Sequence, residues 1–245
     1  MDTEFLRALS NAWSFYCNRL NLILVFSIPF IIAYLLLLLV AAPTFVTLGA
    51  TMLRTGSIPD LSYFDIWIAV LAYLFSFYII AASIVNVNLV VRSKRTLTQI
   101  KDEVITAMGS YAVTIFYVYT IMLLLTYIIN LLTYESGLRT LLYPLATFLL
   151  SFLLFFVPPA VVIDHEDSVG AIKKSVRMAL RRPHFVILWS VLGLIVLMIL
   201  KVLADLLLPG SFAGSAVLLL NSLFVLPFLI IFQTQLYMEK YPLAR

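Results

Sequence analysis

The chain of 245 residues contains one cysteine, two histidines and few charged side chains. With Cys17 as the only cysteine, an intramolecular disulfide is excluded. Charged residues make up 11% of the chain, against about 25% in soluble domains. Hydrophobic residues make up 63%, against about 45–50%. This composition excludes an ordinary soluble domain and predicts a polytopic membrane protein.

The sequence also lacks the local motifs of common enzyme classes. It has no phosphate-binding GxxxxGK[ST] loop, no GxGxxG, no HExxH, no CxxC and no GxSxG. No apolar stretch carries the row of arginines of a voltage sensor or the chain of acids of a proton relay. We therefore expect a protein that is not an enzyme, with no catalytic residues, no metal site and no cofactor.

What the sequence does contain is long uncharged apolar runs. Six of them reach the length of about 20 residues that a membrane helix needs. They are Leu20–Ala42, Ile66–Val90, Tyr111–Leu132, Thr140–Ile163, His184–Leu208 and Ala213–Tyr237. Almost no chain is left for a soluble domain, so we expect residues 1–245 to form one all-α membrane domain.

The basic residues predict the orientation of these spans. Lys and Arg gather on the cytoplasmic side of membrane proteins. If the N-terminus is cytoplasmic, all but three of the 16 basic residues fall on that side, and the exceptions are Arg54, Arg139 and Lys201. We expect a multi-pass protein of the cell membrane with both termini in the cytoplasm.

Three segments carry the apolar spacing of an amphipathic helix. Apolar residues recur at i, i+3, i+7 and i+10 from Leu6, from Leu97 and from Val169, which places each set on one helical face. We expect three interfacial helices on the cytoplasmic side, each followed by an apolar hairpin. The resulting units run from about 3 to 91, 95 to 164 and 167 to 240. They indicate a threefold internal repeat, or three such helices of independent origin.

The third of these segments is the most basic. Lys173, Lys174, Arg177 and Arg181 stand behind its apolar face, and Asp167 or Ser168 can cap its first turn. Such a helix lies in the interface with its cations among lipid phosphates; alternatively, the charges only set the topology. The expected partners are membrane lipids, with a protein partner or a second copy of the chain as further candidates, and no nucleic acid.

Polar residues within the spans are the other candidate sites. The amides Asn86, Asn88, Asn130 and Asn221 are expected to form hydrogen bonds between helices or to face a cavity. Lys201 and Asp205, at i and i+4, are expected to pair near the outer end of the fifth span, or to contact a solute.

Two features lie between the fourth and fifth spans. Pro158-Pro159 should bend or break the fourth span near its inner end. The run from Asp164 to Asp167 contains three acids and His165, which is consistent with a metal site. The acids are better explained as favourable charges before a helix N-terminus.

The same region resembles a known group of proteins. It reads Val157-Pro158-Pro159-Ala160-Val161-Val162-Ile163-Asp164, then Glu166, then Ala171-Ile172-Lys173-Lys174-Ser175. This is similar to the link between spans four and five in six-span prokaryotic proteins, including the membrane domain attached to glycerophosphodiester phosphodiesterases and related uncharacterised inner-membrane families. This chain lacks a phosphodiesterase domain, so the resemblance, mainly over residues 157–182, implies an anchoring, transport or membrane-organising role.

Two functions remain open from the sequence. The first is a membrane module that organises lipids or partner proteins at the cytoplasmic leaflet. The second is a transporter or channel subunit for a small or lipid-like solute. A polar cavity lined by Asn86, Asn130 and Asn221 would favour the second, and a dry apolar interior would favour the first.

Overall fold

The computed structural model describes residues 3–40, 63–96, 100–134, 137 and 139–239, and within these ranges every regular element is a helix. Five segments are long and apolar enough to cross a membrane: Val70–Ser93, Gly109–Leu132, Thr140–Asp164, Pro183–Leu207 and Phe212–Met238. A sixth is counted if the first two helices, which meet at 92°, are taken as one broken span. The predicted all-α, polytopic architecture is confirmed.

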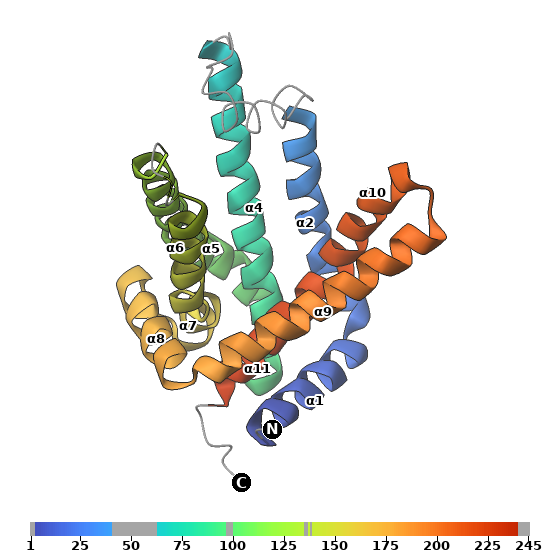
Figure 1. Cartoon of the computed structure of the whole chain (residues 1–245). Coiled ribbons are helices and arrows are strands. Elements are labelled where there is room, and N and C mark those ends of the chain that lie inside the picture. The colour runs from blue at the N-terminus through green and yellow to red at the C-terminus, as the bar shows by residue number, and fades with distance from the viewer. Residues whose placement is uncertain (1–2, 41–62, 97–99, 135–136, 138, 240–245) are drawn as a thin grey trace.

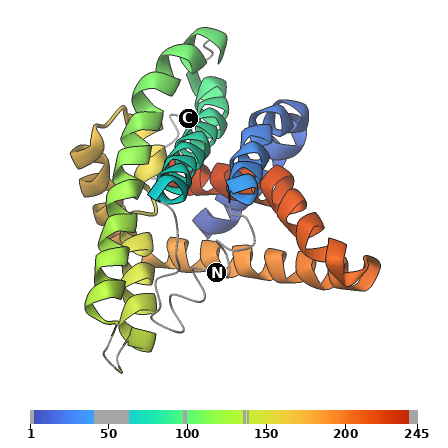
Figure 2. The same ribbon diagram turned by 90° about the horizontal axis from the view of Figure 1, so that it is seen from above.

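The chain forms three helical hairpins that spread from a common end (Figure 1). Figure 2 shows α2 and α4 between α5 on one side and α10 on the other. The helices are α1 (Thr3–Asn18), α2 (Leu20–Val40), α4 (Tyr63–Thr96), α5 (Ile100–Leu132), α6 (Arg139–Leu153), α7 (Val157–Asp164), α8 (Ser168–Arg181), α9 (Pro183–Leu207), α10 (Gly210–Leu220) and α11 (Leu226–Met238).

Most of the core lies at the common end of the hairpins, where α7, α8 and α11 meet. The buried side chains come chiefly from α1, α4, α7 and α11, with Phe156, Phe232 and Tyr237 among the largest. In contrast, α9 buries only Phe185, Val186, Gly193 and Ala204. The end that carries α1 and α8 is therefore the most densely packed part of the described molecule.

The fourth span is broken where the two prolines predict it. Helix α6 ends at Leu153, α7 begins at Val157, and Pro158 and Pro159 lie in the first turn of α7. Proline is tolerated in that turn because its missing N–H would have no helical acceptor. At the other end of α7, His165 adopts a left-handed conformation with φ 55° and turns the chain towards α8.

The second predicted surface helix is not a separate element. The segment that begins at Leu97 was expected to lie on the membrane surface, but α5 runs without a break from Ile100 to Leu132. No proline interrupts it, and Gly109 alone does not break a long helix. Two of the three predicted surface helices, α1 and α8, therefore exist as separate helices.

Helix α1 packs mainly against α11 rather than against its own hairpin. The ring of Phe5 lies 5.2 Å from that of Phe232, and the ring of Trp13 lies 5.8 Å from that of Phe228. Beyond these rings, Arg7 pairs with Glu239 at 2.5 Å. This contact joins the first and last helices of the chain. It therefore links the first of the three predicted units to the third.

The sixth span contains an irregularity that the sequence analysis did not predict. A π-helical segment, Asn221–Val225, separates α10 from α11, and Pro227 follows in the first turn of α11. A π segment contains wider backbone turns, and a proline ring clashes with the carbonyl one turn earlier in a regular helix. The wider turn before Pro227 relieves that clash, so the span continues through the proline.

Candidate functional site: the cationic pocket of α8

Helix α8 begins at a side-chain cap. The carboxylate of Asp167 accepts a hydrogen bond from the backbone N–H of Gly170 at 2.9 Å. This bond satisfies one of the free donors of the first turn. Of the two capping residues that the sequence allows, Asp167 is the one used.

The helix presents three faces. Its buried face consists of Ala171, Ser175, Met178 and Ala179. A second face is apolar but exposed, with Val169 57% and Leu180 63% exposed. The basic residues form the third face: Lys173, Lys174, Arg177 and Arg181.

The apolar face predicted for α8 is not the face that the protein buries. The spacing from Val169 predicts a face turned towards acyl chains, and here Val169 is exposed and Ile172 and Val176 are half-buried. Small side chains at Ala171, Ser175 and Ala179 allow close packing against neighbouring helices, as is common between membrane helices. The larger apolar side chains are therefore left on the outside, where acyl chains can cover them.

Ser175 fastens α8 to the break in the fourth span. Its hydroxyl donates to the carbonyl of Leu153 at 2.7 Å and accepts from the N–H of Phe156 at 3.0 Å. The amide of Gln233 on α11 donates to the carbonyl of Phe155. A broken helix leaves backbone C=O and N–H groups without hydrogen-bond partners. Here the side chains of Ser175 and Gln233 provide those partners.

The acidic run after α7 binds its own structural partners. Asp164, with its side chain only 4% exposed, accepts from Lys174 at 2.8 Å and from the hydroxyl of Tyr237 at 2.8 Å. Lys174 also pairs with Glu166 at 2.6 Å. Burial lowers the pKa of Lys174, but the hydrogen bonds to the two carboxylates outweigh it and raise the pKa above its usual value.

The other two members of this run are also engaged. His165 Nδ1 lies within hydrogen-bond distance of the hydroxyl of Tyr111 on α5, and Asp167 caps α8. Within the described ranges, no three His, Cys, Asp or Glu side chains are grouped to hold a metal ion. The residues of this run, His165 included, join α5, α7, α8 and α11.

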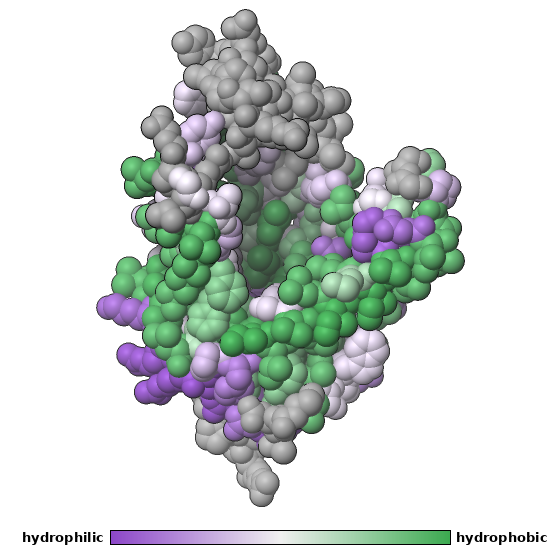
Figure 3. Space-filling model, viewed as in Figure 1, coloured by the Kyte–Doolittle hydropathy of each residue, from purple (hydrophilic) through white to green (hydrophobic). Residues whose placement is uncertain are grey.

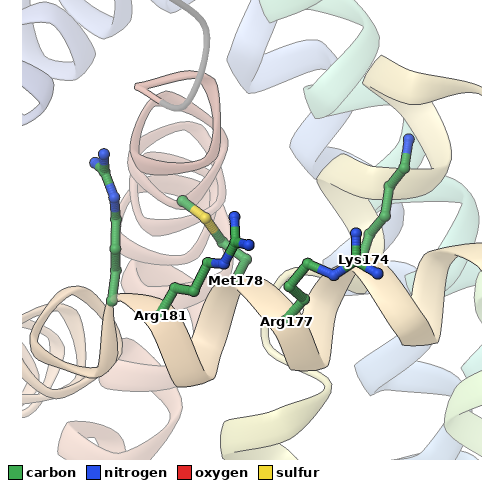
Figure 4. Close-up of a pocket in the computed structure, with 5 residues that line it drawn as sticks. Lys174, Arg177, Met178 and Arg181 are labelled. Atoms are coloured by element: carbon green, nitrogen blue, oxygen red, sulfur yellow. The ribbon is translucent and has the colours of Figure 1, made fainter.

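A pocket of about 390 Å³ opens beside the basic face of α8. It is lined by Lys174, Arg177, Met178, Arg181 and Arg182. Figure 4 shows the side chains of Lys174, Arg177 and Arg181 rising from the same side of the helix. Around α8, Figure 3 shows a hydrophilic band directly beside a hydrophobic surface. Four cations therefore surround one hollow at the border between polar and apolar surface.

These four cations differ in their partners. Lys174 is neutralised by Asp164 and Glu166, and Arg182 pairs with Glu4 of α1 at 2.5 Å. The guanidinium of Arg182 also lies 5.2 Å from the ring centre of Phe185. Arg177 and Arg181 are exposed, and neither has a hydrogen bond or ion pair to any described residue. The positive charge available to a ligand therefore comes from Arg177 and Arg181.

The sequence analysis missed two members of the pocket, Arg182 and Met178. It treated Arg182 only as a topology signal. Its position directly after Arg181 and before Pro183, at the turn between two helices, is the one local sign of a different role. The buried Met178 forms an apolar part of the lining.

The polar residues within the spans do not form one site. Asn88, fully buried on α4, accepts from the hydroxyl of Thr234 on α11 and donates to the carbonyl of Ile84 at 2.8 Å. Asn86, 5% exposed, has a side-chain oxygen without a partner in the structure. The half-buried Asn221 begins the π segment, which packs mainly against α2, α9, α10 and α11, whereas the half-buried Asn130 lies on α5.

The predicted pair of Lys201 and Asp205 is present near the end of α9. Nζ of Lys201 bonds to Oδ1 of Asp205, and the two side chains are 54% and 50% exposed. The pair lies within one helix and joins no second element of the described residues.

Comparison of the chain with protein-family models, curated proteins and solved structures finds no match. The function is therefore argued from the geometry of the chain itself.

Proposed function

We propose that this protein is a non-enzymatic module of the cell membrane that binds and organises anionic lipids at the cytoplasmic leaflet. The observation that carries the proposal is the three-faced helix α8. It combines an anchored buried face, an exposed apolar face, and a basic face with the cationic pocket. An interfacial helix of this kind places apolar side chains among acyl chains and cations among phosphates.

Two further observations support this assignment. The bond network of Asp164, Ser175 and Tyr237 fixes α8 to three other helices, so its basic face is held in one orientation. The distribution of the basic residues predicts that this face lies in the cytoplasmic leaflet, where anionic lipids attract each cation by about 1 kcal/mol. The resemblance of residues 157–182 to six-span membrane domains implies the same kind of role.

The experiment measures the lipids in contact with the protein. In phosphatidylcholine vesicles, spin-labelled phosphatidylglycerol should be immobilised by the wild type in a larger fraction than spin-labelled phosphatidylcholine. The variant R177Q/R181Q should lose most of this difference, because it removes the two exposed cations of the pocket. The control Lys201→Gln, which removes a cation near the other end of α9, should retain it. Equal immobilisation of both lipids by the wild type would contradict the proposal.

One observation favours a second candidate function, the transport of a lipid-like solute. The π segment Asn221–Val225 interrupts the sixth span near its middle, and such segments and interrupted helices frequently mark functional sites. Figure 3 shows a hollow between α6 and α9 whose visible lining is hydrophobic, which suits an apolar solute. Movement of fluorescent lipids between leaflets, faster in proteoliposomes than in protein-free vesicles, would favour this alternative.

A further inference from the structure

We propose that the pocket of α8 is a binding site for a phosphomonoester headgroup, such as that of phosphatidate, with Arg177 and Arg181 as its direct ligands. This inference rests on the proposed function and names the lipid class that the module selects. It predicts that the protein prefers one anionic lipid over another. General attraction to a basic surface predicts no such preference.

The charges around the pocket carry the argument. Lys174 pairs with two carboxylates and Arg182 with one, so these groups offer no net positive charge to a ligand. Arg177 and Arg181 pair with no carboxylate of the described residues, so they are the two cations of the pocket that a ligand can use. A phosphodiester headgroup carries one negative charge, whereas a phosphomonoester carries about −1.5 to −2 at pH 7. A dianionic phosphate can therefore pair with both arginines at full charge, which a diester cannot.

The chemistry of the side chains agrees with this charge balance. Arginine presents planar N–H donors that bind two phosphate oxygens at once, and a terminal phosphate offers three such oxygens. The two free arginines lie four residues apart on one face of α8, so both can reach a single phosphate between them. The volume of about 390 Å³ is near the lower end of the range for small-molecule sites, which admits a small headgroup.

The surroundings of the pocket suit a lipid better than a soluble phosphate. Met178 gives the lining an apolar part, and the exposed Val169 and Leu180 lie on the same helix as the arginines. A lipid can place its phosphate in the pocket and its glycerol and acyl chains along this apolar face. A free phosphate would contact only the charged side chains of the pocket and leave the apolar face uncovered.

The test compares short-chain lipids and inorganic phosphate on the purified, detergent-solubilised protein. Dioctanoyl phosphatidate, dioctanoyl phosphatidylglycerol and inorganic phosphate are titrated separately, and their affinities are measured by thermophoresis. The wild type should bind phosphatidate about tenfold or more tightly than phosphatidylglycerol, which corresponds to one additional charge-assisted contact. It should bind inorganic phosphate more weakly than either lipid.

The variants separate the pocket from the surface charge of α8. R177Q/R181Q should lose about tenfold or more in phosphatidate affinity. R177K/R181K keeps the charge but loses the paired donors, so it should fall between this variant and the wild type. Lys173→Gln is the matched control, because Lys173 is an exposed cation of the same helix outside the pocket. All the replaced side chains are exposed, and circular dichroism verifies that each variant folds.

Four outcomes would overturn the inference: equal affinity of the wild type for the two lipids, equal loss in Lys173→Gln and R177Q/R181Q, wild-type affinity in R177Q/R181Q, or inorganic phosphate binding as tightly as phosphatidate. Equal affinity for the two lipids would leave the proposed function standing, since both are anionic. The proposed function itself fails only if phosphatidylglycerol shows no preference over phosphatidylcholine.

Discussion

Two regions of this molecule use polar residues in opposite ways. The junction, formed by α7, α8 and α11, joins distant parts of the chain through side chains such as Asp164, Ser175 and Gln233. The arm, residues 187–220 of the α9–α10 hairpin, has only small buried residues in its described part, namely Gly193, Ala204 and Ala213. The ion pair of the arm, Lys201 with Asp205, lies within one helix.

The difference follows from the regularity of the helices. An unbroken helix satisfies its own backbone groups, so the arm needs few polar contacts between helices in an apolar environment. At its base, Trp189 donates from Nε1 to the carbonyl of Leu229 on α11 at 2.9 Å. The junction contains the break at residues 154–156 and must supply partners for the carbonyls and N–H groups that the break exposes. Polar side chains are therefore structural in the junction and nearly dispensable in the arm. The basic pocket of α8 lies on the rigid region.

The largest expected effect comes from removing the serine that bridges the break. In Ser175→Ala, the carbonyl of Leu153 and the N–H of Phe156 lose a buried partner. Each unsatisfied group costs about 1–3 kcal/mol, so the free energy of unfolding should fall by about 2–4 kcal/mol. Unfolding by sodium dodecyl sulfate in mixed micelles measures this change.

Ser190→Ala is the matched control in the arm. The hydroxyl of Ser190 donates only to the carbonyl of Val186 in its own helix, which already has a helical partner. Its removal should change the free energy of unfolding by less than about 0.5 kcal/mol. Similar effects of the two substitutions would contradict the contrast between junction and arm.

A smaller effect is expected at Lys174, together with a characteristic dependence on pH. Lys174→Met removes the cation beside the buried Asp164 and should lower the free energy of unfolding by about 1–2 kcal/mol at pH 7, since the lysine is partly exposed. The pKa of Lys174 is raised in the folded state. Its contribution is therefore complete below the unfolded value of about 10.4 and is lost at higher pH.

The measurement compares wild type and variant between pH 7 and 11.5. The difference in their free energies of unfolding should stay constant to about pH 10 and shrink above it, because the lysine of the unfolded chain then loses its proton before the lysine of the folded protein does. Tyrosines titrate in the same range, but they are present in both proteins and largely cancel in the difference. A gap that widens with rising pH would show that the sign of this linkage is wrong.

Structural features that depend on residues close together in the chain are predictable from the sequence. Contacts between residues far apart in the chain are not. The apolar runs, the break at Pro158, the cap at Asp167 and the pair of Lys201 with Asp205 are local patterns, and all are present. The bond of Gln233 to Phe155 joins residues 78 positions apart, and that of Thr234 to Asn88 joins residues 146 apart. A single sequence carries no signal for such pairs.

The face of α8 that the protein buries was missed for a related reason. Periodicity identifies an apolar face, but it does not say whether protein or lipid covers it. Val169 and Leu180 are apolar and exposed, whereas the small residues Ala171 and Ser175 are buried. In a membrane protein the close contacts favour small side chains, so the more hydrophobic face is often the one that faces lipid. The basic residues are easier to place, because their charges stay in contact with solvent. Lys173, Arg177 and Arg181 are all exposed.

The smallest effect is expected for the ion pair of the arm. Replacing Lys201→Met together with Asp205→Leu removes two half-exposed charges at i and i+4. Such a pair contributes about 0.3–0.5 kcal/mol, and two apolar side chains at these positions suit a lipid-facing helix. The free energy of unfolding should therefore change by less than about 0.5 kcal/mol, and the immobilisation of anionic lipids should be unchanged. Unfolding in mixed micelles and spin-labelled lipids measure the two quantities. A loss above about 2 kcal/mol, comparable to that of Ser175→Ala, would mean that the ion pair of Lys201 with Asp205 also holds the arm in place. The comparison between the two regions would then fail, because the polar pair of the arm would be structural like those of the junction.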